Sequence, residues 1–204
     1  SKISVEQTSS EITAQYKSQL ISGNSLIDLT GGFGVDDYYF SQKIKQVVHC
    51  EINGELSQIV QHNFKQLNCT NIKCFLGDSK DFLTKNNAKF DWIYIDPSRR
   101  NDAKGKVFML KDCLPNVPDL LDFYFNYSER LLIKTAPILD LTAGLSELKN
   151  VKEIHIVAVE NEVKELLWII EKDFQKSIVI KTINISKQKV YSFDFQYNYE
   201  SKPN

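Results

Sequence analysis

Short apolar runs alternate with amphipathic stretches along most of this chain. Apolar runs bounded by turn residues are typical of buried strands, and apolar residues three or four positions apart are typical of helices. The pattern predicts strands at residues 25–29, 46–51, 71–76, 90–95 and 131–134. Helices are expected at residues 8–20, 35–44, 56–67, 79–83, from 118 onward and at 141–148. This alternation indicates an α/β fold, with a mostly parallel sheet and helices on both faces.

Two of the expected helices have residue types suited to capping at their starts. Thr8 and Glu11 have the spacing of a capping box, and Ser79 is expected to cap the short helix that carries Phe82 and Leu83. Pro118 is well placed in a first helical turn, because its missing N–H costs nothing there.

The pattern changes after residue 150. Four consecutive strands with short connections are predicted at residues 153–160, 164–171, 177–185 and 189–199. Such strands favour antiparallel pairing, so an antiparallel edge is expected. In the last of them, aromatic side chains alternate with other residues at Tyr191, Phe193, Phe195, Tyr197 and Tyr199. A half-buried strand or a docking surface for a further domain is favoured over a base-stacking platform for RNA.

Composition is that of one ordinary globular domain. The 204 residues are 42% hydrophobic and 25% charged, and no run approaches the ~18 apolar residues of a membrane span. The net charge of −1 gives no overall field that would attract nucleic acid, so such binding needs a local patch or a further domain. No signal peptide is recognisable, and a cytoplasmic protein without membrane contact is expected.

The cysteines and histidines suggest neither a metal site nor nucleophilic catalysis. The four cysteines contain no C-x-x-C pair, and they are expected to be reduced thiols: Cys50, Cys69, Cys74 and Cys113. Cys113 has no histidine nearby in the sequence and is expected to pack or to lie in a loop. The three histidines are scattered, and none is a strong candidate for a base: His49, His62 and His155.

A glycine-rich loop at Thr30–Asp37 follows the first predicted strand. Backbone N–H groups and the helix N-terminus after such a loop can hold a pyrophosphate, as in dinucleotide enzymes. Here two aspartates, Asp36 and Asp37, stand where a pyrophosphate would lie, and no further glycine or alanine allows close helix packing. Asp28, two residues before the loop, is a poor neighbour for phosphate and a good one for an ammonium or sulfonium group. The loop therefore argues against NAD.

Acidic residues also end the next three predicted strands. In an open α/β sheet, ligands bind beyond the carboxyl ends of the strands. Glu51 can accept hydrogen bonds from both ribose hydroxyls of an adenosine, and Asp78 can accept from an adenine amino group. Asp96 ends the fourth strand. Four acids at successive strand ends, one of them beside a glycine loop, indicate a ligand site.

Taken in order, these motifs resemble those of class I S-adenosyl-L-methionine (AdoMet)-dependent methyltransferases. The resemblance runs from about Thr8 to Glu171, and its motifs are Leu26–Gly34, Glu51, Gly77–Asp78 and Asp91–Pro97. It implies one Rossmann-like catalytic domain over residues 1–204 with a seven-stranded sheet, a helical lead-in at 1–24 and a β-rich edge at 153–204. It also implies AdoMet as cofactor and no metal. The implied cofactor-binding residues are Asp28, Thr30, Gly31, Gly32, Phe33, Gly34, Asp36, Glu51, Ile52, Asp78 and Ser79.

A finer resemblance concerns the substrate. Thr8–Ala14 and Gly34–Asp36 are similar to the trimethylguanosine-synthase type of RNA methyltransferase. Together with Asp96–Arg100, they look more like bacterial methyltransferases with a C-terminal THUMP-like domain, a module associated with RNA. This resemblance implies a tRNA or rRNA substrate and flanking domains that assist RNA binding. Because the chain opens with Ser1 rather than methionine, it is expected to be a piece of a longer protein.

By the same resemblance, Asp96–Arg99 occupies the position of the motif that methyltransferases use on exocyclic amines. Asp96 and the Pro97 carbonyl would accept the two amino protons, and Ser98 and Arg99 complete the predicted catalytic loop. Arg99 replaces an aromatic residue of that motif, although a guanidinium plane can also stack on a base. Arg99, Arg100 and Lys134 are the predicted substrate-binding residues. Methylation of an RNA base nitrogen is favoured, while a small-molecule or protein methyltransferase and an inactive AdoMet-binding module remain as alternatives.

Overall fold

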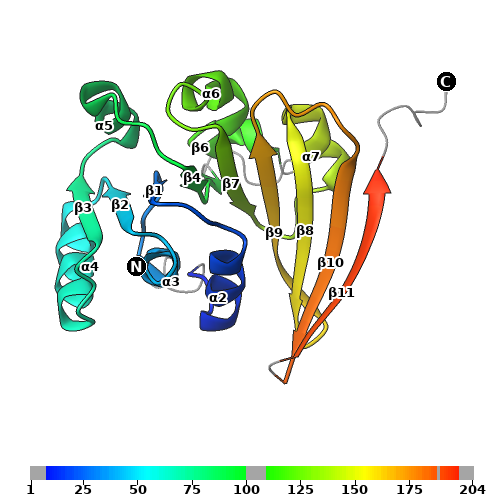
Figure 1. Cartoon of the computed structure of the whole chain (residues 1–204), viewed down its shortest axis with the longest axis horizontal. Helices are drawn as coiled ribbons and strands as arrows, with labels where there is room; N and C mark the ends of the chain where they lie inside the picture. The colour runs from blue at the N-terminus through cyan, green and yellow to red at the C-terminus, as the bar shows by residue number, and fades with distance from the viewer. Residues whose placement is uncertain (1–7, 100–108, 188, 198–204) are drawn as a thin grey trace. The chain divides into compact units, whose positions relative to one another are not determined.

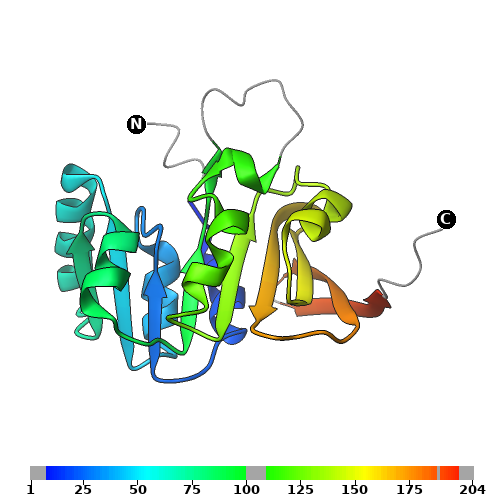
Figure 2. The same ribbon diagram turned by 90° about the horizontal axis from the view of Figure 1, so that it is seen from above.

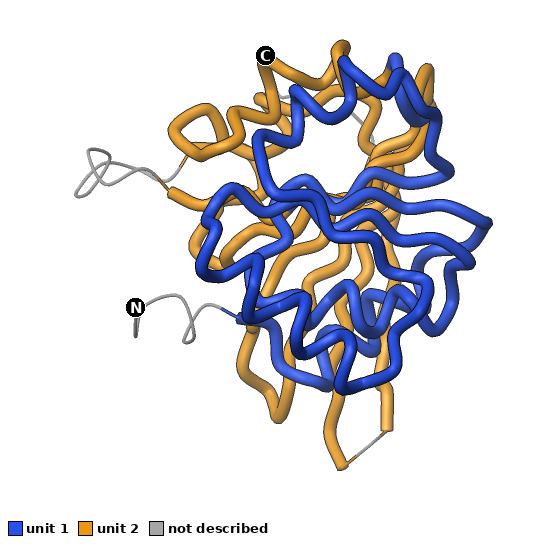
Figure 3. The backbone as a smooth tube through the Cα atoms, turned by 90° about the vertical axis from the view of Figure 1, so that its left-hand side faces the viewer, with its two compact units in different colours: residues 1–95, 126–128 blue, residues 96–125, 129–204 orange. Residues whose placement is uncertain are grey.

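The computed structural model describes residues 8–99, 109–187 and 189–197, which form two compact units (Figure 3). Unit 1 consists of residues 1–95 and 126–128, and unit 2 of residues 96–125 and 129–204. Both combine strands with helices, so the predicted α/β class is confirmed. The proposal of one catalytic domain over the whole chain stays a prediction.

Unit 1 contains a parallel sheet with strand order β4–β1–β2–β3. Its strands are β1 (Ser25–Asp28), β2 (Gln46–Glu51), β3 (Ile72–Leu76) and β4 (Trp92–Ile95). Its helices are α2 (Glu11–Gln19), α3 (Val35–Ser41), α4 (Gly54–Gln66) and α5 (Ser79–Asn86). Helices α2, α3 and α4 lie on one face of the sheet and α5 on the other (Figures 1 and 2). Because all four strands run the same way, their carboxyl ends share one edge, as a ligand site requires.

The two predicted helix caps are each off by one or two residues. Ser10, and not Thr8, caps α2, and its side chain accepts a hydrogen bond from Thr13 N at 3.2 Å. Asp78, and not Ser79, caps α5, and its Oδ1 accepts from Lys80 N at 2.7 Å. Ser10 and Asp78 both have extended backbone, which lets the side chain of each turn back onto the helix that it caps.

Two helices bury only part of the apolar face that their spacing predicts, which is Ile12, Tyr16 and Leu20 in α2 and Leu56, Ile59, Val60, Phe64 and Leu67 in α4. In α2, Ile12 is 42% exposed while Lys17 is fully buried. In α4, Val60 and Phe64 are buried as predicted, whereas Ile59 is exposed. The apolar spacing therefore located both helices correctly but did not determine which side chains face the sheet.

Unit 2 contains a sheet with strand order β11–β10–β8–β9–β7. Its strands are β7 (Arg130–Thr135), β8 (Val151–Val159), β9 (Glu162–Glu171), β10 (Ile178–Ser186) and β11 (Lys189–Tyr197). Strand β9 is antiparallel to both β7 and β8, and β11 is antiparallel to β10. The antiparallel edge is thus confirmed, but β10 pairs with β8 in parallel rather than continuing an antiparallel series. In their sheets the described residues form four strands in unit 1 and five in unit 2, more than the seven expected.

The helices of unit 2 are α6 (Val117–Tyr124) and α7 (Leu141–Glu147), with a short 3-10 helix η2 (Leu110–Asp112). Pro118 lies in the first turn of α6, as predicted. Helix α7 packs against β9 so closely that a Cβ atom at Gly144 would lie 2.4 Å from the ring of Trp168. A two-stranded ribbon of β5 (Ser98–Arg99) and β6 (Cys113–Leu114) was not predicted, because two-residue strands have no periodicity to detect.

Strand β11 ends the sheet of unit 2 and is largely exposed on both faces. Tyr191, Phe193 and Phe195 are 58%, 68% and 41% exposed. The expectation of a half-buried strand is therefore wrong, and nothing in the described part of unit 2 covers this aromatic face. Among the helices that the structure describes, none is long and apolar enough to cross a membrane.

Candidate cofactor and substrate sites

The glycine loop between β1 and α3 is packed directly on its neighbours. A Cβ atom at Gly31 would lie 2.2 Å from His49 Cε1, and one at Gly34 would lie 2.5 Å from Phe64 Cζ. Gly34 also has a φ of +72°, a left-handed conformation that side chains disfavour. The loop is fastened to β2, since Gly31 N donates to the Cys50 carbonyl at 2.9 Å. Gly31 and Gly34 are therefore needed for close packing, apart from any ligand.

Asp28 lies beneath this loop and is only 2% exposed. Its Oδ1 accepts hydrogen bonds from Thr30 N at 2.7 Å and Thr30 Oγ1 at 2.9 Å. Burial, followed by the nearby charge of Asp37, raises the pKa of Asp28 well above its usual range. The contact of Asp28 with an ammonium or sulfonium group stays a prediction.

Glu51 ends β2 and is partly exposed. Its Oε2 accepts from Gly32 N at 3.0 Å and its Oε1 accepts from Asn53 N at 2.6 Å. Each carboxylate oxygen has a second lone pair, so both oxygens can also accept a hydroxyl hydrogen. This arrangement fixes a bidentate acceptor beside the glycine loop.

Apolar side chains accompany Glu51 at the same edge of the sheet. Ile52 is 73% exposed and Leu76, the register partner of Glu51 on β3, is 53% exposed. Exposed apolar residues flanking an acid suit a flat, uncharged ring. Asp78 follows on the same edge, with one oxygen engaged in capping α5. The sequence thus located these residues correctly, and their roles toward a cofactor stay predictions.

Asp36, a predicted cofactor contact, belongs to a buried polar cluster instead. Its Oδ2 accepts from Ser9 Oγ at 2.9 Å and from the Tyr94 hydroxyl at 2.7 Å, and Oδ1 lies 3.3 Å from Lys17 Nζ. The cluster ties α2 to α3 and β4. The carboxylate of Asp36 is therefore engaged within unit 1, and its role toward a cofactor stays a prediction.

Sequence reasoning missed the pairing of Asp37 with His49. Both side chains are fully buried, and His49 Nδ1 lies 2.6 Å from Asp37 Oδ2. His49 was expected to be an ordinary strand histidine. The sequence carries no signal for this pairing. His49 lies beside Asp28 in the adjacent parallel strand, and only the register of β1 and β2 shows this.

Unit 2 contains the predicted substrate residues. Asp96, which follows β4 directly in the chain, forms an ion pair with Lys134 of β7. Lys134 is 8% exposed, so it is not a solvated lysine, and its role toward a substrate phosphate stays a prediction. Ser98 and Arg99 form β5. Arg100 lies outside the described residues.

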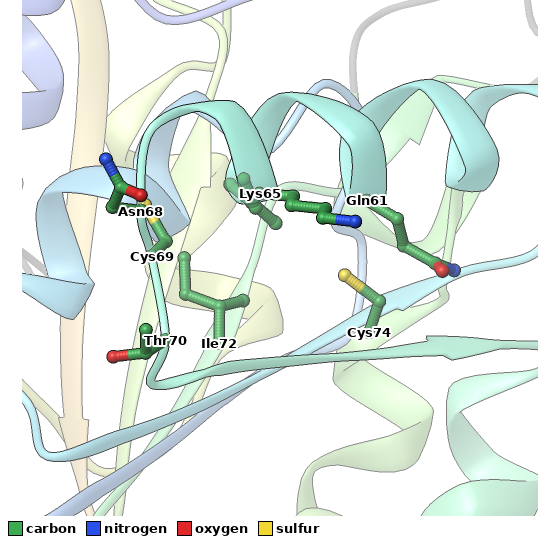
Figure 4. A pocket seen from close by; sticks show the side chains of 8 residues that line it. Gln61, Lys65, Asn68, Cys69, Thr70, Ile72 and Cys74 are labelled. Carbon is green, nitrogen blue, oxygen red and sulfur yellow. The ribbon is translucent and has the colours of Figure 1, made fainter.

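The cysteines are all free, and no group of three or more metal-ligating side chains lies together among the described residues. Cys69 and Cys74 line a pocket of about 440 Å³ between α4 and β3 (Figure 4). Burial raises the pKa of Cys74 to about 11, which keeps it a thiol at neutral pH. Cys113 is buried, consistent with the packing role predicted for it.

Several solved structures are similar to this chain. A Porphyromonas gingivalis W83 protein described as a "putative methyltransferase" is 33% identical, with a TM-score of 0.84 over 96% of this chain and 50% of its own. TrmK of M. capricolum, solved with S-adenosyl-homocysteine, is 15% identical, with a TM-score of 0.60 over 79% and 68% of the two chains. An rRNA methylase of Streptococcus thermophilus is 13% identical, with a TM-score of 0.54 over 79% and 94%.

These likenesses show the Rossmann-like fold of methyltransferases, and this chain spans half the length of the P. gingivalis protein. No curated protein matches the sequence. The model of the family described as "Conserved hypothetical protein 95" matches residues 4–112, which is more than half of the chain. This chain therefore belongs to the family conserved hypothetical protein 95.

Proposed function

We propose that this chain is an AdoMet-dependent methyltransferase whose cofactor is bound by unit 1. The observation that carries the proposal is Glu51, a bidentate acceptor tied to Gly32 N and bordered by the exposed side chains of Ile52 and Leu76. The similarity to the P. gingivalis protein supports it, as does the fold shared with TrmK, which was solved with the demethylated product of AdoMet.

The residues present fit an adenosyl amino acid better than a dinucleotide. A pyrophosphate would bind at the N-terminus of α3, where the helix dipole is positive. Asp36 and Asp37 occupy that first turn and both are buried, so a phosphate there would meet two carboxyl groups. The ribose and adenine of AdoMet require only hydroxyl acceptors and an apolar cleft.

Each residue would bind a separate part of the cofactor. Glu51 would accept hydrogen bonds from both ribose hydroxyls through the lone pairs that Gly32 and Asn53 leave unused. Ile52 and Leu76 would flank the adenine ring, and Asp78 would accept from its amino group. When bound, AdoMet supplies an electrophilic methyl group on a sulfonium leaving group.

In unit 2, Asp96 is the proposed acceptor for the substrate amine. Asp96 is paired with Lys134, and its carboxylate can accept an N–H hydrogen bond but cannot donate one. The Pro97 carbonyl would accept the second amino hydrogen and leave the nitrogen lone pair available for methyl transfer. Arg99 would stack on the base or bind a backbone phosphate.

The proposed substrate is an RNA base nitrogen, of tRNA or rRNA. The fold shared with an rRNA methylase and with TrmK supports this choice. A small-molecule or protein substrate is the second candidate, favoured by the net charge of −1, which gives no general attraction for RNA.

A transfer assay tests the proposal. Protein is incubated with methyl-labelled AdoMet and either total bacterial RNA or an RNA-depleted extract. We expect label in RNA, a loss of at least ~100-fold in Asp96→Ala with unchanged AdoMet binding, and no loss in the control Asp122→Ala.

Label in protein or small molecules only would favour the second candidate. Binding of AdoMet without transfer to any fraction would indicate an inactive binding module. Equal activity of Asp96→Ala and wild type would contradict the role of Asp96.

A further inference from the structure

Three titratable side chains are buried together beneath the glycine loop. Asp28 of β1, Asp37 of α3 and His49 of β2 are 2%, 0% and 0% exposed. Asp37 Oδ2 lies 2.6 Å from His49 Nδ1, and a side-chain hydrogen bond with Asp28 lowers the pKa of Asp37. None of these three residues has a role in the methyl transfer proposed above.

The hydrogen bonds determine where a proton must lie. Two ionised carboxylates cannot hydrogen-bond to each other, so one of Asp28 and Asp37 is protonated. Asp28 Oδ1 already accepts from Thr30 N and Thr30 Oγ1, which leaves Oδ2 to carry the proton. Asp28 then donates to Asp37, and Asp37 also accepts from the Nδ1–H group of His49. This assignment leaves one negative charge on the three groups, at the N-terminus of α3, where the helix dipole stabilises it.

The same three residues support the backbone that faces the cofactor. Asp28 accepts hydrogen bonds from Thr30, and Gly31 packs against the ring of His49. That ring packs edge-on against the ring of Phe64, with ring centroids 5.7 Å apart. A change of position or charge in this group therefore moves Gly31 and Gly32, and Gly32 N is the donor that fixes Glu51.

We propose that Asp28, Asp37 and His49 form a proton-sharing chain that positions the glycine loop for the cofactor. In it Asp28 is a neutral acid, Asp37 is the carboxylate and His49 is a neutral imidazole. The proposal rests on the proposed function, because the loop is taken to bind AdoMet.

The surroundings act on these protonation states in both directions. Burial, followed by the charge of Asp36, raises the pKa of Asp37 and so disfavours its carboxylate, whereas the hydrogen bond with Asp28 lowers that pKa; Lys17 neutralises Asp36 from the α2 side. Burial lowers the pKa of His49 more than Asp28 and Glu51 raise it. His49 Nε2 and Asp37 Oδ1 have no hydrogen-bond partner among the described residues, so a proton on Nε2 would be buried unpaired. The thiols of Cys50 and Cys74 are the remaining titratable groups beside His49.

The proton sharing among Asp28, Asp37 and His49 predicts a pH range in which the cofactor binds most tightly. As pH falls, His49 becomes charged only below its usual pKa of ~6.5, because burial lowers that pKa. As pH rises through the raised pKa of Asp28, a second buried charge appears beside Asp37. Either event disturbs the loop, so AdoMet affinity is highest between these limits and falls on both sides.

Two conservative variants imitate the assigned protonation states. In Asp28→Asn, the amide oxygen still accepts from Thr30 and the amide nitrogen donates to Asp37, as the neutral acid does. In His49→Asn, the amide nitrogen can replace Nδ1–H but cannot gain a proton. Asp81→Asn and His62→Gln are the matched controls, since both residues are exposed.

The test measures AdoMet affinity by calorimetry from pH 5 to pH 9, together with the infrared band of a protonated carboxyl group. We expect Asp28→Asn to bind AdoMet within ~3-fold of wild type at pH 7, to lose the alkaline fall and to lose the infrared band. Asp28→Ala should weaken binding at least ~10-fold, because Thr30 and Asp37 lose their partner. In His49→Asn, AdoMet affinity should no longer fall at low pH. In the two controls, affinity should still fall at both low and high pH, and the infrared band of the protonated carboxyl group should remain.

The proposal is overturned if Asp28→Asn weakens binding as much as Asp28→Ala while remaining folded, since Asp28 would then act as an ion. It is also overturned if wild type lacks the infrared band that Asp28→Asn should remove. Failure of wild type to bind AdoMet at any pH, with the band present, would refute the proposed function and the role in cofactor positioning while supporting the shared proton.

Discussion

Replacing Gly31 by alanine tests the packing beneath the glycine loop. The new Cβ atom would lie 2.2, 2.4 and 2.7 Å from three atoms of the His49 ring, well inside van der Waals contact. The ring has little freedom to withdraw, because Asp37 Oδ2 lies 2.6 Å from its Nδ1 and the ring of Phe64 packs against it in a T-shaped arrangement. The loop and the ring must therefore separate, and the buried hydrogen bond is strained.

The expected cost follows from this geometry. Overpacking a well-packed interior costs ~1–3 kcal/mol, and a rigid, hydrogen-bonded neighbour places Gly31→Ala near the upper limit, at ~3 kcal/mol. For a chain of 150–250 residues, 1 kcal/mol changes Tm by about 2–4 °C, so a decrease of ~6–12 °C is expected. Gly54→Ala is the matched control, because its Cβ atom would meet only Leu76 Cδ2 at 3.9 Å, an ordinary contact.

Urea unfolding and thermal scans of Gly31→Ala, Gly54→Ala and wild type measure these differences. Gly54→Ala should be neutral or stabilised by up to ~1 kcal/mol, because alanine is the better helix former. A second comparison in the His49→Ala background separates the clash from other effects, since removal of the ring should recover most of the loss. A loss of less than ~0.5 kcal/mol in Gly31→Ala, or an equal loss with and without the ring, would refute the packing argument.

Three further predictions concern buried and capping groups. Lys17→Met should cost ~3–5 kcal/mol in urea unfolding, because it leaves Asp36 as a buried charge without its ammonium partner; a cost below ~1 kcal/mol would contradict this reading. Asp140→Ala should cost about 1 kcal/mol, since it removes the side chain that accepts from the first turn of α7, and an unchanged Tm would argue against the cap. The hydrogen bond from His155 lowers the pKa of Glu153 from 4.5 to about 2, so its stabilising contribution is complete above pH 4.5 and is lost as the pH falls toward 2. In Glu153→Gln, the free energy of unfolding should depend less on pH between 2 and 4.5 than in wild type. A pH dependence equal to that of wild type would contradict the lowered pKa of Glu153.

The order of strands and helices in unit 1 could be predicted from the sequence because its buried strands are continuous apolar runs. Strand β2, Gln46–Glu51, has the predicted limits. Glu51 could be placed at a ligand edge for the same reason, since it ends a strand in a parallel sheet. The pairing of β10 with β8 in parallel depends on contacts between residues far apart in the chain, which periodicity does not record.

The chemistry of the individual acids was harder to predict. Asp28, Asp36 and Glu51 look alike in the sequence, yet two are buried in polar clusters and one is partly exposed. Their roles depend on which way each side chain points and on partners such as Lys17 and Thr30. Asp28 shows that an acid at the end of a strand can be buried and hydrogen-bonded to the backbone of the loop that follows it.

The most direct test of the account is a titration of wild type and Glu51→Ala with AdoMet and with NAD, measured by calorimetry. The account predicts that wild type binds one AdoMet and no NAD. Glu51→Ala should bind AdoMet about 10–100-fold more weakly, since it loses hydrogen bonds from a charged acceptor to the ribose. Binding of NAD in preference to AdoMet, or an unchanged AdoMet affinity in Glu51→Ala, would contradict it.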